Sequence, residues 1–251
     1  MKSLKFFQDL QSAVQFITIL PAGTGHGFNP MGMIRFFPLV GIIVGLGLAL
    51  VDAVASFLWP DSVSAVFGVL YLVVVTGAFH LDGLGDTADG IFSHRSKERA
   101  LEIMKDSRSG MMGLVAVFMV LALKTAGIYA VKTSVPYSEV LLYMVFIPGL
   151  SRGAMLFGIR FLPYGRPQGT GHDLFSEKLP LRAFGYSLIP VAGLLVFTAN
   201  GWLVLLTFLL FTALTLWFYR SKLGVITGDM LGAMTEATEA VLFLTAGIQM
   251  I

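Results

Sequence analysis

Residues 36–59 read FFPLVGIIVGLGLALVDAVASFLW, and this stretch decides the fold class of the chain. Its one charged residue is Asp52. About 20 mostly apolar residues in a helix are enough to cross the hydrocarbon core of a bilayer. A helix suits that environment because it satisfies its backbone polar groups internally. The stretch is therefore predicted to be a transmembrane helix.

Similar stretches recur along the whole chain. Of its 251 residues, 56% are hydrophobic and 13% are charged, whereas a soluble domain carries about 25% charged residues. The sequence predicts an all-α, polytopic helical membrane protein that forms a single integral membrane domain over 1–251. Residues 1–20 are predicted to form an amphipathic helix lying along the membrane surface. Seven transmembrane spans are predicted, at 36–59, 62–81, 110–131, 138–159, 183–199, 201–219 and 224–251.

The basic residues predict which ends face the cytoplasm. With the N-terminus inside, fourteen lysines and arginines fall in inside segments, and Lys132 alone falls outside. The positive-inside rule then predicts a cytoplasmic N-terminus and an external C-terminus. The polar segments 80–109, 160–182 and 220–230 would share the cytoplasmic face. Segment 160–182 is rich in glycine, proline and arginine, and is expected to be either a mobile lid or an ordinary surface loop.

The sequence has no cysteine, which excludes disulfides, thiolate metal sites and cysteine nucleophiles. Its most informative polar motif is an acidic one. Asp82, Asp86 and Asp89 have the spacing i, i+4, i+7, which places three carboxylates on one face of a helix. Carboxylates so close together repel, and a divalent cation relieves that repulsion. Ligation by a few carboxylates, with water and substrate phosphates, is typical of magnesium. We therefore predict a Mg²⁺ site here rather than a solvated acidic loop.

Residues flanking the acidic motif could take part in the same chemistry. His80 is either a direct participant or an interfacial residue at the end of a span. Lys105 and Arg108 precede the third predicted span and suit phosphate, arginine through paired hydrogen bonds and lysine as a point charge. The alternative for both is that they only flank a span on its cytoplasmic side.

The last predicted span also carries acids. Asp229, Glu236 and Glu239 lie on one helical stripe, and each charge at membrane depth costs ~2.5 kcal/mol or more. We predict a functional role for Asp229, a substrate contact for Glu236, and an ion pair between Glu239 and Lys124, which lies at a similar depth. Arg152 could face either a phosphate or these acids.

These motifs together resemble those of the cobalamin synthase family, also described as adenosylcobinamide-GDP ribazoletransferase. The resemblance covers nearly the whole chain in length, span pattern and motif order, although segment 160–182 departs from the family pattern. The motifs that carry it are HLDGLGDTADG at 80–90, LEIMKDSR at 101–108, Ser-Arg-Gly at 151–153, and GDMLGA at 228–233 followed by Glu236 and Glu239.

The resemblance implies an enzyme that joins adenosylcobinamide-GDP to α-ribazole, or to α-ribazole 5′-phosphate, with release of GMP. It also implies magnesium dependence, a metal and phosphate centre, and residence in a prokaryotic cytoplasmic membrane. The expected partners are these small molecules and membrane lipid, without nucleic acid, and the resemblance leaves room for association with other cobalamin-pathway enzymes. By this likeness the centre consists of Asp82, Asp86, Asp89 and Asp229.

Three other functions are less consistent with the sequence. A membrane phosphotransferase of the CDP-alcohol type would use similar chemistry, but its acidic motif is arranged differently. An ion-coupled transporter would also carry intramembrane charges, but many transporters show paired halves, and this sequence shows no internal repeat. A structural scaffold would not need three aligned carboxylates.

Overall fold

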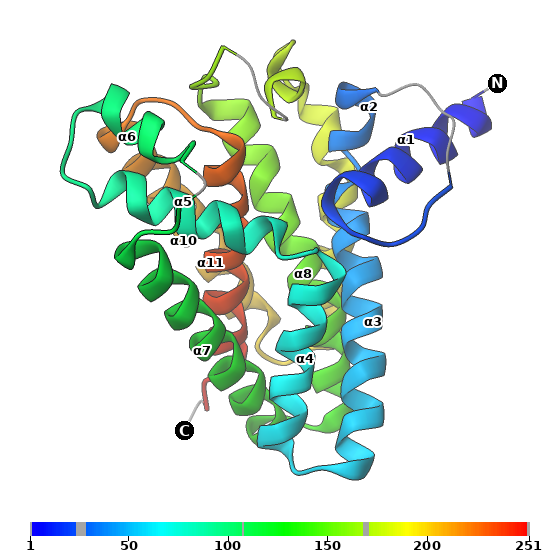
Figure 1. The fold of residues 1–251 in the computed structure, drawn as a ribbon. Coiled ribbons are helices and arrows are strands. Elements are labelled where there is room, and N and C mark those ends of the chain that lie inside the picture. Colours follow the sequence, from blue (N-terminus) through cyan, green and yellow to red (C-terminus); the bar gives the residue numbers. More distant parts are fainter. Residues whose placement is uncertain (1, 24–28, 107, 168–170, 250–251) are drawn as a thin grey trace.

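The computed structural model of the protein describes residues 2–23, 29–106, 108–167 and 171–249. Within these ranges the chain forms helices and no strand, which confirms the all-α class. Long helices run along one axis, and shorter ones cross one end (Figure 1). We call the end that carries α1 (Lys2–Ile17), α2 (Pro30–Ile34), α5 (Phe79–Ile91) and α6 (Lys97–Ile103) the polar end, and the opposite end the far end. The first helix lies at the polar end, and the last helix finishes near the far end (Figure 1).

Several helices are suited to crossing a membrane, so the protein is a multi-pass membrane protein. Among the described residues, four helices are long and apolar enough, and a fifth span is counted if the bent pair of α4 (Asp61–Val75) and α5 (Phe79–Ile91) is taken as one. The number seven predicted from sequence is therefore not confirmed. The four are α3 (Phe37–Leu58), α7 (Met111–Ser134), α8 (Tyr137–Phe161) and α10 (Gly201–Lys222).

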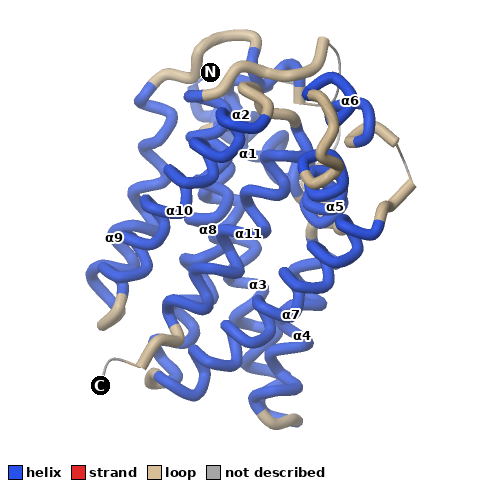
Figure 2. The backbone as a smooth tube through the Cα atoms, turned by 90° about the vertical axis from the view of Figure 1, so that its left-hand side faces the viewer, coloured by secondary structure: helices blue, strands red, loops and turns tan. Residues whose placement is uncertain are grey.

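The remaining predicted spans also correspond to helices, but to shorter or more polar ones. Helix α9 (Leu188–Phe197) follows a 3₁₀ turn, η2 (Leu181–Ser187), and forms the predicted hairpin with α10, beside which it lies in Figure 2. Helix α11 (Gly228–Ala246) carries three acids. Residues 250 and 251, included in the last predicted span, lie outside the described residues.

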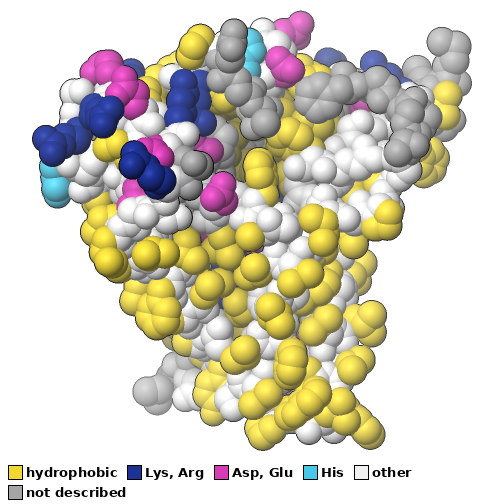
Figure 3. Space-filling view, in the orientation of Figure 1, with side chains coloured by type: hydrophobic (Ala, Val, Ile, Leu, Met, Phe, Trp, Pro, Cys, Tyr) yellow, Lys and Arg dark blue, Asp and Glu magenta, His cyan; other side chains and the backbone are white. Residues whose placement is uncertain are grey.

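The surface divides into an apolar region and a charged one. Apolar side chains cover the lower part of the molecule in Figure 3, and charged side chains gather at the polar end around α5 and α6. Few residues of α7 and α10 are buried along their apolar lengths, whereas α8 is mostly buried. Helices α7 and α10 therefore lie at the periphery of the bundle, and α8 forms its centre.

Close packing of α3 on α8 depends on small residues. A Cβ atom added at Gly41 would lie 2.2 Å from the carbonyl oxygen of Pro148, and one at Gly45 would lie 2.3 Å from that of Val145. The two backbones therefore touch where side chains would keep them apart, as is common between membrane helices.

The chain turns sharply at the end of α4 (Asp61–Val75). Gly77 and Ala78 adopt positive φ angles of 58° and 57°, and the next helix, α5 (Phe79–Ile91), departs at 88° to α4. The prediction of one span over 62–81 is thus wrong at its end, because the left-handed residues break the helix. As a result α5, with the acidic motif, lies across the polar end (Figure 1).

The N-terminal helix α1 (Lys2–Ile17) packs on the bundle along one side only. Leu4 and Phe7 are exposed, whereas Ala13 and Ile17 are buried against the bundle. Buried Asp9 holds α1 to the segment that precedes α3 through a 2.8 Å ion pair with Arg35. Contact of α1 with the membrane surface remains a prediction, and Met1 lies outside the described residues. The short helix α2 (Pro30–Ile34) links α1 to α3.

A second polar cluster lies at the far end. Asp52 is fully buried, and its carboxylate accepts a 2.5 Å hydrogen bond from the Lys132 ammonium. Ser64 also donates to Asp52 at 2.5 Å, and Asp61 lies 3.2 Å from Lys132. These contacts tie α3, α4 and α7 together, which indicates a structural role for Asp52 and Asp61.

Candidate active site

The acidic helix α5 packs directly on the start of α11, through glycines. A Cβ at Gly83 would lie 2.7 Å from the carbonyl oxygen of Asp229, and a Cβ at Gly232 would lie 3.1 Å from the backbone of His80. The side chain of Thr227 caps α11 by accepting a hydrogen bond from the Met230 amide. The crossing therefore brings the first turns of two helices, distant in sequence, to the same place.

This crossing gathers the four aspartates predicted as a centre. Asp82 is exposed, and Asp86, Asp89 and Asp229 are half-buried. Burial, together with the negative charges of Asp82, Asp229 and Asp89, raises the pKa of Asp86 to about 7. The cluster thus holds more negative charge than its own surroundings balance, which is the electrostatic condition that favours a bound cation.

Asp229 has a cationic partner that its local sequence does not indicate. The Arg166 guanidinium lies 2.5 Å from its carboxylate and also donates to the carbonyl oxygen of Met104 at 3.1 Å. Arg166 belongs to segment 160–182, of which residues 168–170 lie outside the described residues. The sequence predicts that this segment and the start of α11 lie on the same membrane face. That prediction does not indicate which residue of the segment contacts Asp229.

Asp89 is engaged differently from its neighbours. One carboxylate oxygen accepts from the Gly110 amide at 2.6 Å, and the other accepts from the Gly113 amide at 2.8 Å. Both amides belong to the N-terminus of α7, which attracts negative charge through its unpaired N–H groups and the helix dipole. Asp89 therefore anchors α7 to the acidic helix.

The donor chemistry suits Mg²⁺, although the described side chains form no group of three or more metal-ligand residues that could hold an ion. Magnesium usually takes one or two protein carboxylates and completes its shell with water and substrate phosphates. Asp82 and Asp86 can supply these carboxylates. Movement of Arg166 from the Asp229 carboxylate to another anion would free both carboxylate oxygens of Asp229 for the ion.

The predicted phosphate ligands Lys105 and Arg108 lie at the surface of the polar end. Arg108 is exposed and forms a 2.6 Å ion pair with Asp106, while Lys105 is exposed after the short helix α6 (Lys97–Ile103). Exposed ion pairs contribute little to stability, so both side chains can reorient toward a substrate. Ser107, between them, lies outside the described residues.

A buried ion network lies beneath the aspartates. The Lys124 ammonium is 2.5 Å from the Glu236 carboxylate and 2.7 Å from that of Glu239, which confirms the predicted pair. Arg152 also pairs with Glu239. Of the two partners predicted for Arg152, a phosphate or the acids of the last span, the structure therefore shows the acids. Ser151 donates to Glu239 at 3.0 Å. The network joins α7, α8 and α11, and it places Arg152 and Glu236 away from solvent.

His80 lies between the network and the aspartates. Its side chain is 1% exposed, and its Nδ1 atom lies 4.0 Å from the Glu236 carboxylate. Neither ring nitrogen has a hydrogen-bond partner within the described part of the chain. His80 is therefore shielded from solvent and oriented toward the network rather than toward the surface of the acidic helix.

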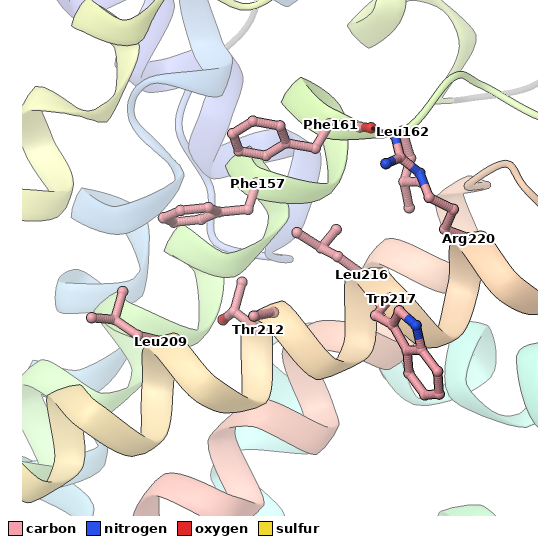
Figure 4. Close-up of a pocket in the computed structure, with 9 residues that line it drawn as sticks. Phe157, Phe161, Leu162, Leu209, Thr212, Leu216, Trp217 and Arg220 are labelled. Carbon is pink, nitrogen blue, oxygen red and sulfur yellow. Dashed lines mark hydrogen bonds between the residues drawn. The ribbon is translucent and has the colours of Figure 1, made fainter.

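A large apolar cavity on the bundle lies apart from this chemistry. It has a volume of 520 Å³ and lies between α8 and α10, where Phe157, Leu209, Leu216 and Trp217 line it and Arg220 stands at one end (Figure 4). Its lining includes no acid, and the Leu209 and Trp217 side chains at its wall are exposed. It does not suit phosphate chemistry.

These features define a multi-pass membrane protein with a carboxylate-rich site, partnered by arginine, at its polar end. The chain belongs to the cobalamin-5-phosphate synthase family, whose model matches residues 9–247.

Individual relatives agree with this assignment. An adenosylcobinamide-GDP ribazoletransferase of Roseiflexus sp. (strain RS-1) is 38% identical, over 95% of this chain and 89% of its own length. Proteins of the same name from Alkaliphilus metalliredigens and Desulforamulus reducens are 37% and 36% identical. The alignment with the Alkaliphilus protein covers 91% of this chain and 90% of that relative. The alignment with the Desulforamulus protein covers 95% of this chain and 96% of that relative. No solved structure matches the chain.

Proposed function

We propose that this protein transfers the adenosylcobinamide phosphate group from adenosylcobinamide-GDP to α-ribazole, or to α-ribazole 5′-phosphate. The products are GMP and adenosylcobalamin, or its 5′-phosphate. Family membership supports the reaction class. The observation that carries the proposal is the meeting of the α5 aspartates with Asp229 and Arg166 at the polar end, because a reaction on a pyrophosphate needs both cation-binding carboxylates and a phosphate-binding cation.

The chain's own residues can perform the steps of this transfer. A ribazole hydroxyl attacks one phosphorus of the pyrophosphate, a new P–O bond forms, and the P–O bond to GMP breaks. Asp82 or Asp86 accepts the hydroxyl proton, since both lie on the accessible side of α5 and buried His80 does not. Arg166 leaves Asp229 for the phosphate and stabilises the charge that develops there.

Magnesium is part of the proposal. Asp82, Asp86 and Asp229 would hold it, and when bound it would neutralise charge on the pyrophosphate and on the departing GMP. The Asp89 carboxylate would contribute less to binding this ion, because both of its oxygens already accept hydrogen bonds from amides of α7. Lys105 and Arg108 would contact phosphate from the surface, and Glu236 and Arg152 would support the site from beneath.

We place the protein in the cytoplasmic membrane of a prokaryote, with the polar end in the cytoplasm. The excess of lysine and arginine at that end supports this orientation. Water-soluble substrates would then reach the aspartates directly, and other enzymes of the pathway could dock at the same face. Family membership disfavours the CDP-alcohol phosphotransferase, transporter and scaffold alternatives.

The proposal is tested with the full chain purified in detergent. Adenosylcobinamide-GDP, α-ribazole and Mg²⁺ are added, and release of GMP is measured. We expect release to require both α-ribazole and Mg²⁺. Parallel reactions with α-ribazole 5′-phosphate identify the preferred acceptor. Absence of acceptor-dependent GMP release with either compound would contradict the proposed function.

A further inference from the structure

A second cavity lies at the polar end. It has a volume of 660 Å³ and is lined by the end of α8 and by residues from 163–166 and 172–178. This volume is in the range of small-molecule sites. Unlike the cavity between α8 and α10, it is lined by charged and aromatic side chains, including Arg160, Tyr164, Arg166, Phe175, Glu177 and Lys178.

The cavity and the aspartate centre share a wall. Arg166 lines the cavity and at the same time pairs with Asp229. The backbone beside it is held to the segment that precedes α11, because the Gly165 amide donates to Ile226 and the Ile226 amide donates to Pro163, both at 2.9 Å. A molecule in the cavity could thus extend past Arg166 to the carboxylates.

The charge of the lining suits a phosphate. Arg160, Arg166 and Lys178 outnumber the single acid, Glu177. The Nε atoms of Arg160 and Arg166 are buried, and neither has a hydrogen-bond partner among the described residues. A buried donor without a partner costs free energy, and a phosphate oxygen would relieve that cost.

The aromatic side chains suit a nucleobase. The rings of Tyr164 and Phe175 lie 4.8 Å apart at 31°, and the ring of His172 meets Tyr164 edge-on at 5.9 Å. Aromatic surfaces of this kind bind bases by stacking. The carboxylate of Glu177 accepts hydrogen bonds and donates none when ionised. It therefore complements guanine, whose N1–H and 2-amino groups are neighbouring donors.

We propose that this cavity binds the guanosine monophosphate half of the donor substrate and holds GMP after transfer. Tyr164 and Phe175 contact the base, Glu177 selects guanine, and Arg160 and Lys178 bind the phosphate. Arg166 marks the boundary with the reacting pyrophosphate. The assignment rests on the proposed transferase function for the identity of the nucleotide.

Calorimetric titration of GMP into the detergent-purified full chain tests the proposal without turnover. We expect Lys178→Gln and Arg160→Gln each to weaken GMP binding about tenfold. Glu177→Gln should reduce the preference for GMP over inosine monophosphate, which lacks the 2-amino group, by about tenfold.

Arg95→Gln removes an exposed arginine from the same end and should bind GMP like the parent. Melting temperatures check that Arg160→Gln is folded, and exposed Lys178 provides the variant least able to disturb folding.

Steady-state kinetics separate this inference from the proposed function. Lys178→Gln should raise the KM for adenosylcobinamide-GDP about tenfold and leave the KM for α-ribazole unchanged. Normal turnover with unchanged donor KM and GMP affinity in both Lys178→Gln and Glu177→Gln would overturn the cavity assignment while leaving the function intact. GMP binding that depends on these residues, in a protein without transferase activity, would support the cavity and refute the function. Equal affinity of the parent for GMP and AMP would also overturn the assignment.

Discussion

Individual aspartates of the acidic motif have different surroundings despite their regular spacing. Asp82 is open to solvent, Asp86 lies among three other acids, and Asp89 binds the N-terminus of α7. A spacing of i, i+4, i+7 indicates a shared helical face, but it does not show what that face contacts. The three substitutions to asparagine are therefore expected to act differently.

Asp86→Asn should abolish most activity without loss of stability. Asparagine keeps the size of the side chain but removes charge that a hard cation requires, and a loss of ~4 kcal/mol in transition-state stabilisation slows turnover about a thousandfold. Removing one of four neighbouring acids also relieves repulsion, so the melting temperature should stay equal or rise. GMP release across magnesium concentrations, with thermal melting, measures both effects.

Glu98→Gln, an exposed acid on α6, is the matched control and should stay active. Parent-like turnover of Asp86→Asn at low magnesium would show that Asp86 is not part of the centre.

Asp89→Asn should lose stability as well as activity. Its carboxylate accepts from two amides of α7, whereas asparagine offers one oxygen and turns an NH₂ group toward the second amide. Loss of a charge at a helix N-terminus costs up to ~2 kcal/mol in partly buried geometry. We expect a lower melting temperature than for Asp86→Asn, measured in the same detergent. Equal melting temperatures would show that the contact with α7 contributes nothing to stability.

At the scale of helices, two crossings organise the site. Helix α5 lies on α11 through Gly83 and Gly232, where side chains would separate the backbones. Below this crossing, charges from α7, α8 and α11 meet inside the bundle. A buried ion network is costly to break at one member, because the remaining charge is left without a partner.

The arrangement of this network predicts which second substitution rescues Lys124→Met. Loss of Lys124 leaves Glu236 without its 2.5 Å partner, whereas Glu239 still pairs with Arg152. Lys124→Met should therefore cost ~3–5 kcal/mol. Adding Glu236→Gln should recover much of that loss, and adding Glu239→Gln should recover less, because it leaves Arg152 unpaired.

Melting of the single and double variants in detergent compares the two rescues. Additive losses in the cycle with Glu236→Gln would refute the coupling between Lys124 and Glu236.

At the scale of the whole molecule, charge and apolar surface are separated along one axis. Charged side chains gather at the polar end, above a surface that is largely apolar (Figure 3). This separation makes the orientation in the membrane the main determinant of which compartment supplies the substrates.

Single cysteines in this cysteine-free chain test the orientation. Ser96 and Ser176 are exposed at the polar end, and Ser138 is exposed at the start of α8. Ser96→Cys and Ser176→Cys should be protected from an impermeant thiol reagent in intact cells, while Ser138→Cys should react. Permeabilised cells provide the control in which all three react. Labelling of Ser96→Cys from outside intact cells would invert the topology.

Much of this protein follows from local sequence. Apolar segments such as 36–59 determine a helical membrane protein, because each helix satisfies its own backbone in lipid. The helical period places Asp82, Asp86 and Asp89 on one face, and matching depth in two spans predicts that Lys124 meets Glu239. These inferences succeed because hydropathy and periodicity act within a segment and need no knowledge of its neighbours.

The tertiary structure decided what depends on contacts between distant segments. Alanine does not favour a positive φ angle, yet Ala78 adopts one, and the resulting turn places α5 across the polar end. Asp89 binds α7, and Arg166 reaches Asp229, although nothing local distinguishes these residues from others of their type. Side-chain partners are selected by how helices cross, and the crossing angles arise from packing of the whole bundle rather than from any one segment.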